Sequence, residues 1–245
     1  MSLTIEHVTG GYGHLPVLKD ISFEVHSGEM VGLIGLNGAG KSTTIKHIIG
    51  LLEATKGKIE IDGLTLKSDI EKYRKQIGYI PETPSLYEEL TLREHIEVTA
   101  MAYGIPLEVA MKRAEKLLET FRLEKRLDWF PANFSKGMKQ KVMILCAFLI
   151  EPSLYIIDEP FLGLDPLAIN ALLELMVEMK KSGSAILMST HILATAEKYC
   201  DRFVVLHNGE VRAQGTLEEL RESFNLPDSS LDEIYVALTK EQGHE

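Results

Sequence analysis

Residues 35–42 read Gly-Leu-Asn-Gly-Ala-Gly-Lys-Ser, which matches the pattern G-x-x-x-x-G-K-[ST]. Glycines in such a segment let successive backbone N–H groups curl around phosphate oxygens without obstruction by side chains. Residues 30–34 form a short apolar segment typical of a buried strand, and a helix is predicted over residues 43–52. The glycine-rich segment, called the phosphate loop below, therefore stands between a strand and a helix, as phosphate binding requires.

The motif of the phosphate loop predicts a role for each of its polar side chains. Lys41 is placed to reach the β- and γ-phosphates of a nucleotide as a point charge, and the Ser42 hydroxyl is placed to ligate Mg²⁺. The positive end of the following helix adds attraction for anions. A glycine-rich turn with an accidental Lys-Ser pair is the alternative, and the strand-to-helix setting disfavours it. The predicted phosphate-binding residues are Gly35, Leu36, Asn37, Gly38, Ala39, Gly40, Lys41, Ser42 and Thr43.

A second apolar segment, residues 154–157, is followed by two carboxylates, Asp158 and Glu159. Ligands of parallel sheets gather at the carboxyl edge of the strands, so Asp158 is predicted to bind Mg²⁺ directly or through water. Glu159 is predicted to be the catalytic base that orients and polarises an attacking water. Two solvated carboxylates after a strand are the alternative, and the phosphate loop weighs against it.

The order of predicted elements indicates the fold class. Strands alternate with helices, which predicts an α/β fold with a mainly parallel sheet of the P-loop NTPase kind. Strands with period-2 alternation in the N-terminal third predict an antiparallel β subdomain, and strongly helical segments predict a helical subdomain inserted at about residues 88–150. We expect one nucleotide-hydrolysing domain over residues 3–235 and a C-terminal tail over residues 236–245.

The C-terminal stretch carries apolar residues at helical spacing, at Leu231, Ile234, Tyr235 and Leu238. Packing of this helix on the core is the favoured interpretation. A role in contacts between two copies of the chain is the alternative.

Charge and composition disfavour several classes of function. The chain has 26 Lys and Arg against 36 Asp and Glu, a formal net charge of -10, which opposes a nucleic-acid-binding surface. Its longest uninterrupted apolar run, residues 142–150, is far shorter than the roughly 20 residues that span a bilayer. We therefore expect any membrane role to depend on a partner. Only two cysteines, Cys146 and Cys200, occur, so no disulfide framework is expected.

A further motif at residues 134–138, Phe-Ser-Lys-Gly-Met, gives the chain a resemblance to the ATP-binding cassette (ABC) family. Ser135 is predicted to cap a helix whose N-terminus attracts anions. In the family this signature segment faces the γ-phosphate held by a second subunit. The resemblance thus implies a homodimer that sandwiches two ATP molecules, with Ser135 and Gly137 contacting ATP. A simple capped helix is the alternative.

The same resemblance gives roles to residues that carry little meaning alone. Tyr12 resembles the aromatic that stacks on adenine, although a lone tyrosine is more often a surface or packing residue. His191 follows a predicted strand and resembles the catalytic histidine that contacts the γ-phosphate. Residues 163–165, Gly-Leu-Asp, resemble the loop that crosses the dimer interface. The implied cofactors are ATP and Mg²⁺.

Two departures from the family pattern stand out. Glu82 occupies the position where the family usually has a glutamine that ligates Mg²⁺. A carboxylate also ligates Mg²⁺ but adds negative charge near the phosphates. An ordinary loop residue is the alternative for Glu82. In the signature segment, Lys136 replaces the first glycine and Met138 replaces the glutamine, whereas Ser135 and Gly137 are retained.

Residues 86–91 and 134–142 are similar to one bacterial subgroup of the family. This similarity implies an ATP-hydrolysing subunit that powers transport, in the direction of export, through a separate polytopic membrane permease. It places the chain on the cytoplasmic face of the cell membrane and implies no nucleic-acid partner. A regulatory cassette that acts as an ATP-dependent switch is the alternative. A soluble ATPase of DNA or ribosomes is less favoured, because such relatives usually carry a long coiled-coil insertion or two cassettes.

Overall fold

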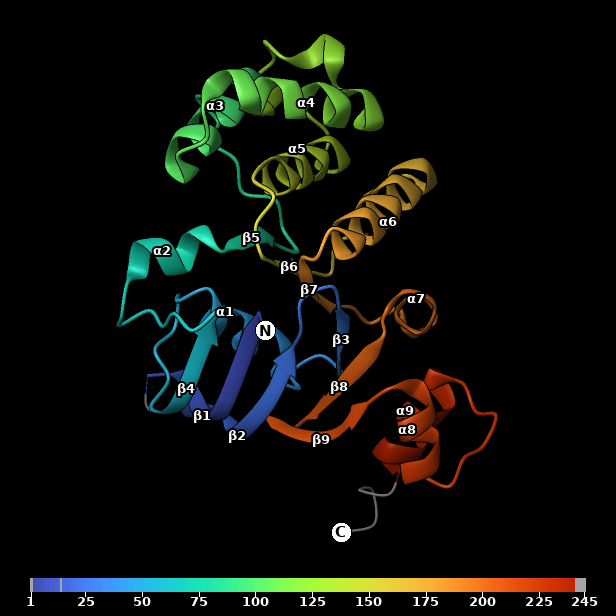
Figure 1. Ribbon diagram of the computed structural model, residues 1–245. Helices are drawn as coiled ribbons and strands as arrows, with labels where there is room; N and C mark the ends of the chain where they lie inside the picture. The colour runs from blue at the N-terminus through green and yellow to red at the C-terminus, as the bar shows by residue number, and fades with distance from the viewer. Residues whose placement is uncertain (1, 14, 241–245) are drawn as a thin grey trace.

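Two β-sheets and a group of helices make up the computed structural model, which describes residues 2–13 and 15–240 (Figure 1). The first sheet has the order β2-β1-β4 and is antiparallel, with β1 Leu3–Tyr12, β2 Leu15–Val25 and β4 Lys56–Ile61. Ile21, Phe23 and Val25 of β2 are buried, as their alternation with polar residues predicts. The predicted N-terminal antiparallel subdomain is thus present.

The second sheet has the order β5-β6-β7-β3-β8-β9. Its neighbours are parallel except for β8 and β9, which form a hairpin across Asn208 and Gly209. This confirms the predicted mainly parallel sheet. The strands are β3 Met30–Ile34, β5 Ile77–Ile80, β6 Leu154–Asp158, β7 Ala185–Ser189, β8 Arg202–His207 and β9 Glu210–Gly215.

The parallel sheet is apolar on both faces because each face has its own cover. Val31 and Leu33 of β3 point into a core shared with the antiparallel sheet and α1 (Lys41–Ile48). Met30 and Ile34 of the same strand belong to a second core, shared with the helices on the opposite face. This double cover explains why β3 reads as a continuous apolar run.

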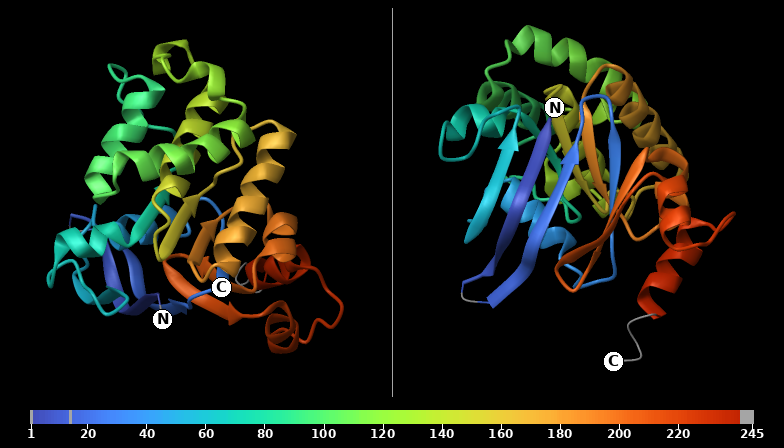
Figure 2. Two further views of the ribbon diagram at one scale, coloured as in Figure 1. Left: turned by 45° about the horizontal axis from the view of Figure 1, so that its top comes forward. Right: turned by 60° about the horizontal axis from the view of Figure 1, so that its bottom comes forward.

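The inserted helices lie together beyond the β5 edge of the parallel sheet and remain grouped in both views of Figure 2. They are α3 Leu92–Tyr103, α4 Leu107–Phe121 and α5 Lys136–Leu149, and the segment between α4 and α5 contains short 3₁₀ turns at Glu124–Arg126 and Pro131–Asn133. Ser135 caps α5 as predicted, since its Oγ accepts the Met138 N–H at 3.3 Å. No helix in the described part of the chain has the length and hydropathy needed to cross a bilayer.

The other helices among the described residues are α2 Ile70–Lys75, α6 Pro166–Lys181, α7 Leu193–Tyr199, α8 Leu217–Ser223 and α9 Leu231–Lys240. Asp165 caps α6 by accepting the Ala168 N–H at 2.9 Å, as the Asp-Pro pair predicts. The sequence-based boundary between residues 235 and 236 falls inside α9. The last five residues of the predicted tail, 241–245, lie outside the described residues.

Candidate nucleotide-binding site

The parallel strands bring the candidate residues to one edge of the sheet. Strands β3, β5, β6 and β7 run in the same direction, so their carboxyl ends lie side by side. The phosphate loop follows β3, Glu82 follows β5, and His191 follows β7. Glu159 follows β6, which ends at Asp158. Ligand sites of open α/β sheets form at this edge.

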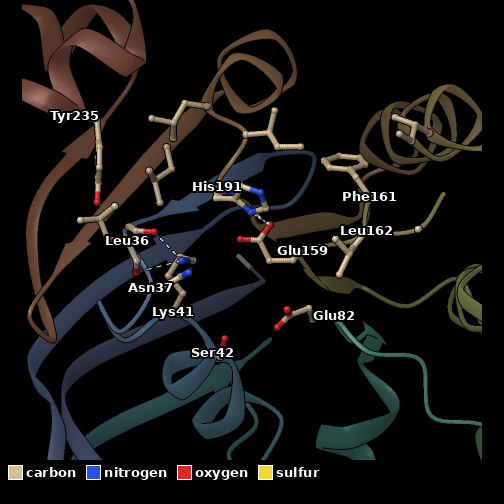
Figure 3. Close-up of a pocket in the computed structure, with 16 residues that line it drawn as sticks. Leu36, Asn37, Lys41, Ser42, Glu82, Glu159, Phe161, Leu162, His191 and Tyr235 are labelled. Atoms are coloured by element: carbon tan, nitrogen blue, oxygen red, sulfur yellow. Dashed lines mark hydrogen bonds and ion pairs between the residues drawn. The ribbon is translucent and has the colours of Figure 1, made fainter. Parts of the chain in front are cut away.

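A cavity of about 760 Å³ lies at this edge and is open to solvent (Figure 3). Among the predicted site residues, those that line it are Gly35, Leu36, Asn37, Lys41, Ser42, Glu82, Glu159 and His191. The predicted site residues that do not line it are Tyr12, Gly38, Ala39, Gly40, Thr43, Ser135, Gly137 and Asp158. Residues distant in sequence thus converge around the phosphate loop.

Glycine is required at three positions of the phosphate loop. Gly38 and Gly40 have φ of 84° and 113°, in the left-handed region that other residues rarely adopt. A Cβ at Gly35 would lie 2.6 Å from the Leu206 carbonyl oxygen. The Lys41 Nζ folds toward the start of the loop and donates to the Gly35 oxygen at 2.7 Å. The ammonium group is therefore held beside the loop at the wall of the cavity.

Asp158 is 4% exposed, and its Oδ1 is buried with no hydrogen-bond partner among the described residues. Burial raises the pKa of this carboxyl group; the Ser189 hydroxyl and the Lys41 charge oppose the rise, whereas the negative charges of Glu159 and Glu82 add to it. Ser42 lies on the first turn of α1, which begins at Lys41. Asp158 ends β6 at the same sheet edge as the Ser42 hydroxyl and the Glu82 and Glu159 carboxylates, and oxygen donors of these kinds are the ligands that Mg²⁺ prefers.

Glu159 and His191 form a hydrogen-bonded pair at the cavity (Figure 3). The Nδ1 of His191 lies 2.7 Å from Glu159 Oε2, and the His191 backbone N–H donates to the same oxygen at 3.2 Å. The Glu159 side chain is only 14% exposed. Its φ of 46° is left-handed, a strained conformation for a residue other than glycine. The pair leaves Oε1 of Glu159 free of these two bonds to meet a water or substrate.

Glu82 is exposed, lines the cavity and lies on a segment tied to α5. The preceding residue, Pro81, accepts a hydrogen bond from Gln140 Nε2 at 3.3 Å, and Gln140 is fully buried. Further along the segment, Glu88 pairs with Lys139 at 2.8 Å. The start of α5 therefore contacts the loop that carries Glu82 at two places.

Tyr12 lies at the end of β1 and is 45% exposed. Its hydroxyl accepts a hydrogen bond from Lys46 Nζ at 3.0 Å, and the same nitrogen lies 5.2 Å from the ring centre. The side chain thus contacts α1 and does not line the cavity. Its predicted role in stacking on adenine stays a prediction.

Comparison with known proteins identifies the family. The sequence model of the ABC transporter family matches residues 18–162, which is more than half of the chain. The chain belongs to the ABC transporter family. It is 67% identical over 244 residues, 99% of each chain, to the ABC-type transporter ATP-binding protein EcsA of Bacillus subtilis (strain 168). This identity confirms the resemblance of residues 86–91 and 134–142, which is to the Ecs-type subgroup.

Solved structures agree with this ABC assignment. One, described as an ATP-binding subunit of an ABC transporter, is 63% identical, covers 98% of this chain and 100% of its own, and has a TM-score of 0.96. Another is a dimeric ATP-binding cassette in a post-hydrolysis state bound to ADP and Pi. It is 27% identical, covers 88% of this chain and 98% of its own, and has a TM-score of 0.79. The chain is therefore an ATP-binding, ATP-hydrolysing subunit of the ABC transporter family.

The signature segment of this ABC subunit lies outside the cavity of its own chain. Gly137 packs against Gly163, and a Cβ at Gly137 would lie 2.3 Å from the Gly163 oxygen. Lys141, one helical turn along α5, pairs with Asp165 at 2.7 Å. The side chain of Lys136 also runs close to Gly163. The signature segment is thus fixed to the loop over residues 163–165, whose Gly163 lines the cavity.

Sequence reasoning missed several residues that line the cavity of this ABC subunit. Phe161 and Leu162 follow the acidic pair, and Ile192 and Leu193 follow His191. Only their position next to the predicted catalytic residues Glu159 and His191 could have indicated that these four residues line the cavity. Tyr235 also lines the cavity, although it comes from α9 at the far end of the chain. The helical spacing of residues 231–238 predicted the helix but not this placement.

Proposed function

We propose that the chain powers export through a separate membrane-spanning subunit by hydrolysing ATP in a dimer of two copies. The pair of Glu159 and His191, facing Lys41 and Ser42 across one cavity, is the observation that carries this proposal. The name of the relative EcsA supports transport as the process, and the similarity of residues 86–91 and 134–142 to the Ecs type supports the direction.

In the proposed mechanism the phosphate loop binds the triphosphate through its backbone N–H groups and Lys41. Glu159 accepts the proton of the attacking water, and His191 holds the Glu159 carboxylate in place through its bonds to Oε2. A base positioned in this way starts each turnover with its carboxylate already oriented.

The proposed Mg²⁺ would be held by Ser42, Asp158 and Glu82, and it would neutralise charge that develops on the phosphate oxygens. Within the described residues, no group of three or more His, Cys, Asp or Glu converges as a metal site. In the proposed site the phosphates of the nucleotide would supply the remaining ligands. The orphaned Oδ1 of Asp158 supports its place in this ligand set.

The placement of Ser135 and Gly137, which do not line the cavity of their own chain, supports the proposed dimer. We propose that they contact ATP bound to the second copy, as the dimeric relative with ADP and Pi suggests. The N-terminus of α5, capped by Ser135, offers backbone N–H groups to the γ-phosphate. Closure and reopening of this dimer would move the inserted helices α3, α4 and α5, which we propose contact the membrane subunit.

Purification of the tagged chain from membranes of its own host tests the transport proposal. We expect a polytopic membrane protein to copurify in a fixed ratio, and reconstitution of the pair in liposomes to give ATP-dependent movement of a substrate. Recovery of the chain without any membrane protein, together with nucleotide binding but negligible hydrolysis, would instead favour the regulatory switch.

The Glu82→Gln variant tests the metal role of Glu82. If Glu82 ligates Mg²⁺, its replacement by a neutral amide oxygen should raise the Mg²⁺ concentration for half-maximal hydrolysis about tenfold, because the charge that strengthens the contact is lost and a loss of about 1.4 kcal/mol weakens binding tenfold. Steady-state hydrolysis across a Mg²⁺ titration measures this value. Glu89→Gln removes the same charge from an exposed residue nearby and serves as the control. Identical Mg²⁺ curves for Glu82→Gln and wild type would remove Glu82 from the metal site.

A further inference from the structure

Gln140 is a buried polar residue that the proposed mechanism does not use. It lies near the start of α5, and its side chain is fully buried. Its Nε2 donates to the Pro81 carbonyl oxygen at 3.3 Å, whereas its Oε1 has no hydrogen-bond partner among the described residues. A backbone carbonyl oxygen can only accept, so the NH₂ end of the amide must face Pro81.

Packing alone does not explain an amide at this position. A buried amide oxygen without a partner costs stability, and an apolar side chain of similar size would avoid this cost. The next buried residues of the same helix, Val142, Ile144 and Leu145, are all apolar. The bond to the Pro81 oxygen is therefore what a glutamine adds at position 140.

This bond fixes the backbone from which the Glu82 side chain starts. The Pro81 C=O and the Glu82 N–H belong to one planar peptide unit, so the orientation of one sets that of the other. Glu82 lines the nucleotide cavity together with Ser42, and its carboxylate points toward the side of the cavity that carries Ser42 in Figure 3. Gln140 thus reaches the cavity through a single peptide group.

The rest of the loop that carries Glu82 is held on the inserted helices. Glu88 pairs with Lys139 of α5 at 2.8 Å. The Tyr87 N–H donates at 3.0 Å to Nε2 of His95, which is buried on α3. The loop is therefore attached to α3 and α5, and its Glu82 end reaches the nucleotide cavity.

The start of α5 is attached on its other side to a second segment that lines the cavity. A Cβ at Gly137 would lie 2.3 Å from the Gly163 oxygen, so the two backbones are in direct contact. Lys141, whose side chain is only 15% exposed, pairs with Asp165 at 2.7 Å. Gly163 lines the cavity. The signature segment is thus held between two segments that border the nucleotide site of its own chain.

We propose that Gln140 is a positioning residue that couples the nucleotide site of its own chain to the signature segment presented to the second copy. Through Gln140, the position of Glu82 beside a bound nucleotide sets the position of Ser135 and Gly137. The inference rests on the proposed dimer. Loss of the bond should remove coupling free energy between the two sites. Pairing of two chains by MgATP should therefore weaken, while nucleotide binding by a single chain is retained.

The test compares Gln140→Leu with Tyr103→Phe, each made in a Glu159→Gln parent that should bind ATP without consuming it. Each variant removes one side-chain donor that links an inserted helix to the β5 segment, since the Tyr103 hydroxyl donates to the Ile77 oxygen at 2.8 Å. Tyr103 lies at the end of β5 away from Glu82 and does not line the cavity. Sedimentation with MgATP across protein concentrations gives the dissociation constant of the dimer, and calorimetric titration with MgADP gives that of the nucleotide.

We expect Gln140→Leu to raise the dissociation constant of the MgATP-bound dimer roughly 2- to 10-fold, the effect of losing one neutral hydrogen bond. MgADP binding should stay at the strength of the parent. Tyr103→Phe should change neither constant. Dimerisation of Gln140→Leu as strong as in the parent would overturn the inference. MgADP binding weakened as much as dimerisation would also overturn it, because Gln140 would then support only the cavity of its own chain.

The Glu88→Lys variant tests the same attachment at a site where folding is not at risk, because the Glu88 side chain is 53% exposed. The new charge repels Lys139 and should weaken dimerisation in the same direction. If Gln140→Leu did not fold, dimerisation of Glu88→Lys at the strength of the parent would overturn the coupling. A parent that stayed a single chain with saturating MgATP would instead contradict the proposed dimer, and this inference with it.

Discussion

Replacement of Glu159 with glutamine is expected to slow ATP turnover by a factor on the order of 10² to 10⁴, the range for loss of a general base. The amide cannot accept the proton of the attacking water. It retains the shape of the carboxylate, and its oxygen still accepts the two bonds from His191. ATP binding should therefore be preserved. Phosphate release at saturating MgATP measures turnover, and equilibrium titration measures binding.

The matched control for this variant is Glu178→Gln. Glu178 is an exposed residue of α6 that pairs with Lys116 at 2.8 Å, away from the cavity. Exposed pairs of this kind contribute little to stability, so the control should hydrolyse ATP at the wild-type rate. Near-normal turnover in Glu159→Gln would be incompatible with the assigned role of Glu159.

The Lys41→Ala variant is expected to bind MgATP roughly 10- to 100-fold more weakly than wild type. Hydrogen bonds to charged groups are worth about 1.5–3 kcal/mol, and each 1.4 kcal/mol changes a dissociation constant about tenfold. The variant also loses the contact between Nζ and the Gly35 oxygen, which orders the start of the loop. Titration with a fluorescent ATP analogue, followed by competition with ATP, measures the change.

Lys67→Ala controls for the loss of a positive charge. Lys67 is exposed and pairs only loosely with Glu53, at 3.2 Å, outside the cavity. Both variants carry the same net charge, so a general electrostatic effect would weaken ATP binding equally in the two. Equal binding by Lys41→Ala and Lys67→Ala would show that Lys41 makes no direct contact with the phosphates.

Local motifs made part of the site predictable from the sequence. The phosphate loop needs left-handed glycines and a helix start at fixed spacing, so residues 35–42 show both features in eight consecutive positions. The caps at Ser135 and Asp165 are equally local, because each side chain bonds a backbone N–H three residues later. Contacts between residues only a few positions apart can therefore be predicted from the sequence pattern.

Contacts between residues far apart in the sequence produce no such pattern and could not be predicted. Strand β5 has only four residues and was not predicted, yet it positions Glu82 at the edge of the sheet. The order of the parallel strands also depends on pairings between distant segments, such as β3 with β7. Tyr235 lines the cavity because three apolar residues of α9 pack this helix on the core. None of these contacts follows from spacing along the chain.

The backbone conformation of Glu159 is a third feature that could not be predicted from the sequence. Its position after an apolar strand predicted a catalytic carboxylate, but nothing in the sequence predicted its left-handed backbone or its bond to His191. Left-handed conformations favour glycine, so a glutamate in one is held by the surrounding structure. Here the Glu159 N–H donates to the Ser189 oxygen at 2.9 Å, which continues the pairing of β6 with β7.

We propose that ATP is hydrolysed at a site completed by a second copy of the chain. Light scattering on the Glu159→Gln variant distinguishes a dimer from a single chain, because this variant should bind ATP without consuming it. We expect the 27.4 kDa mass of one chain without nucleotide or with MgADP, and close to twice that mass with MgATP. A single-chain mass with MgATP, at concentrations where ATP binding is saturated, would show that ATP does not bring two copies together.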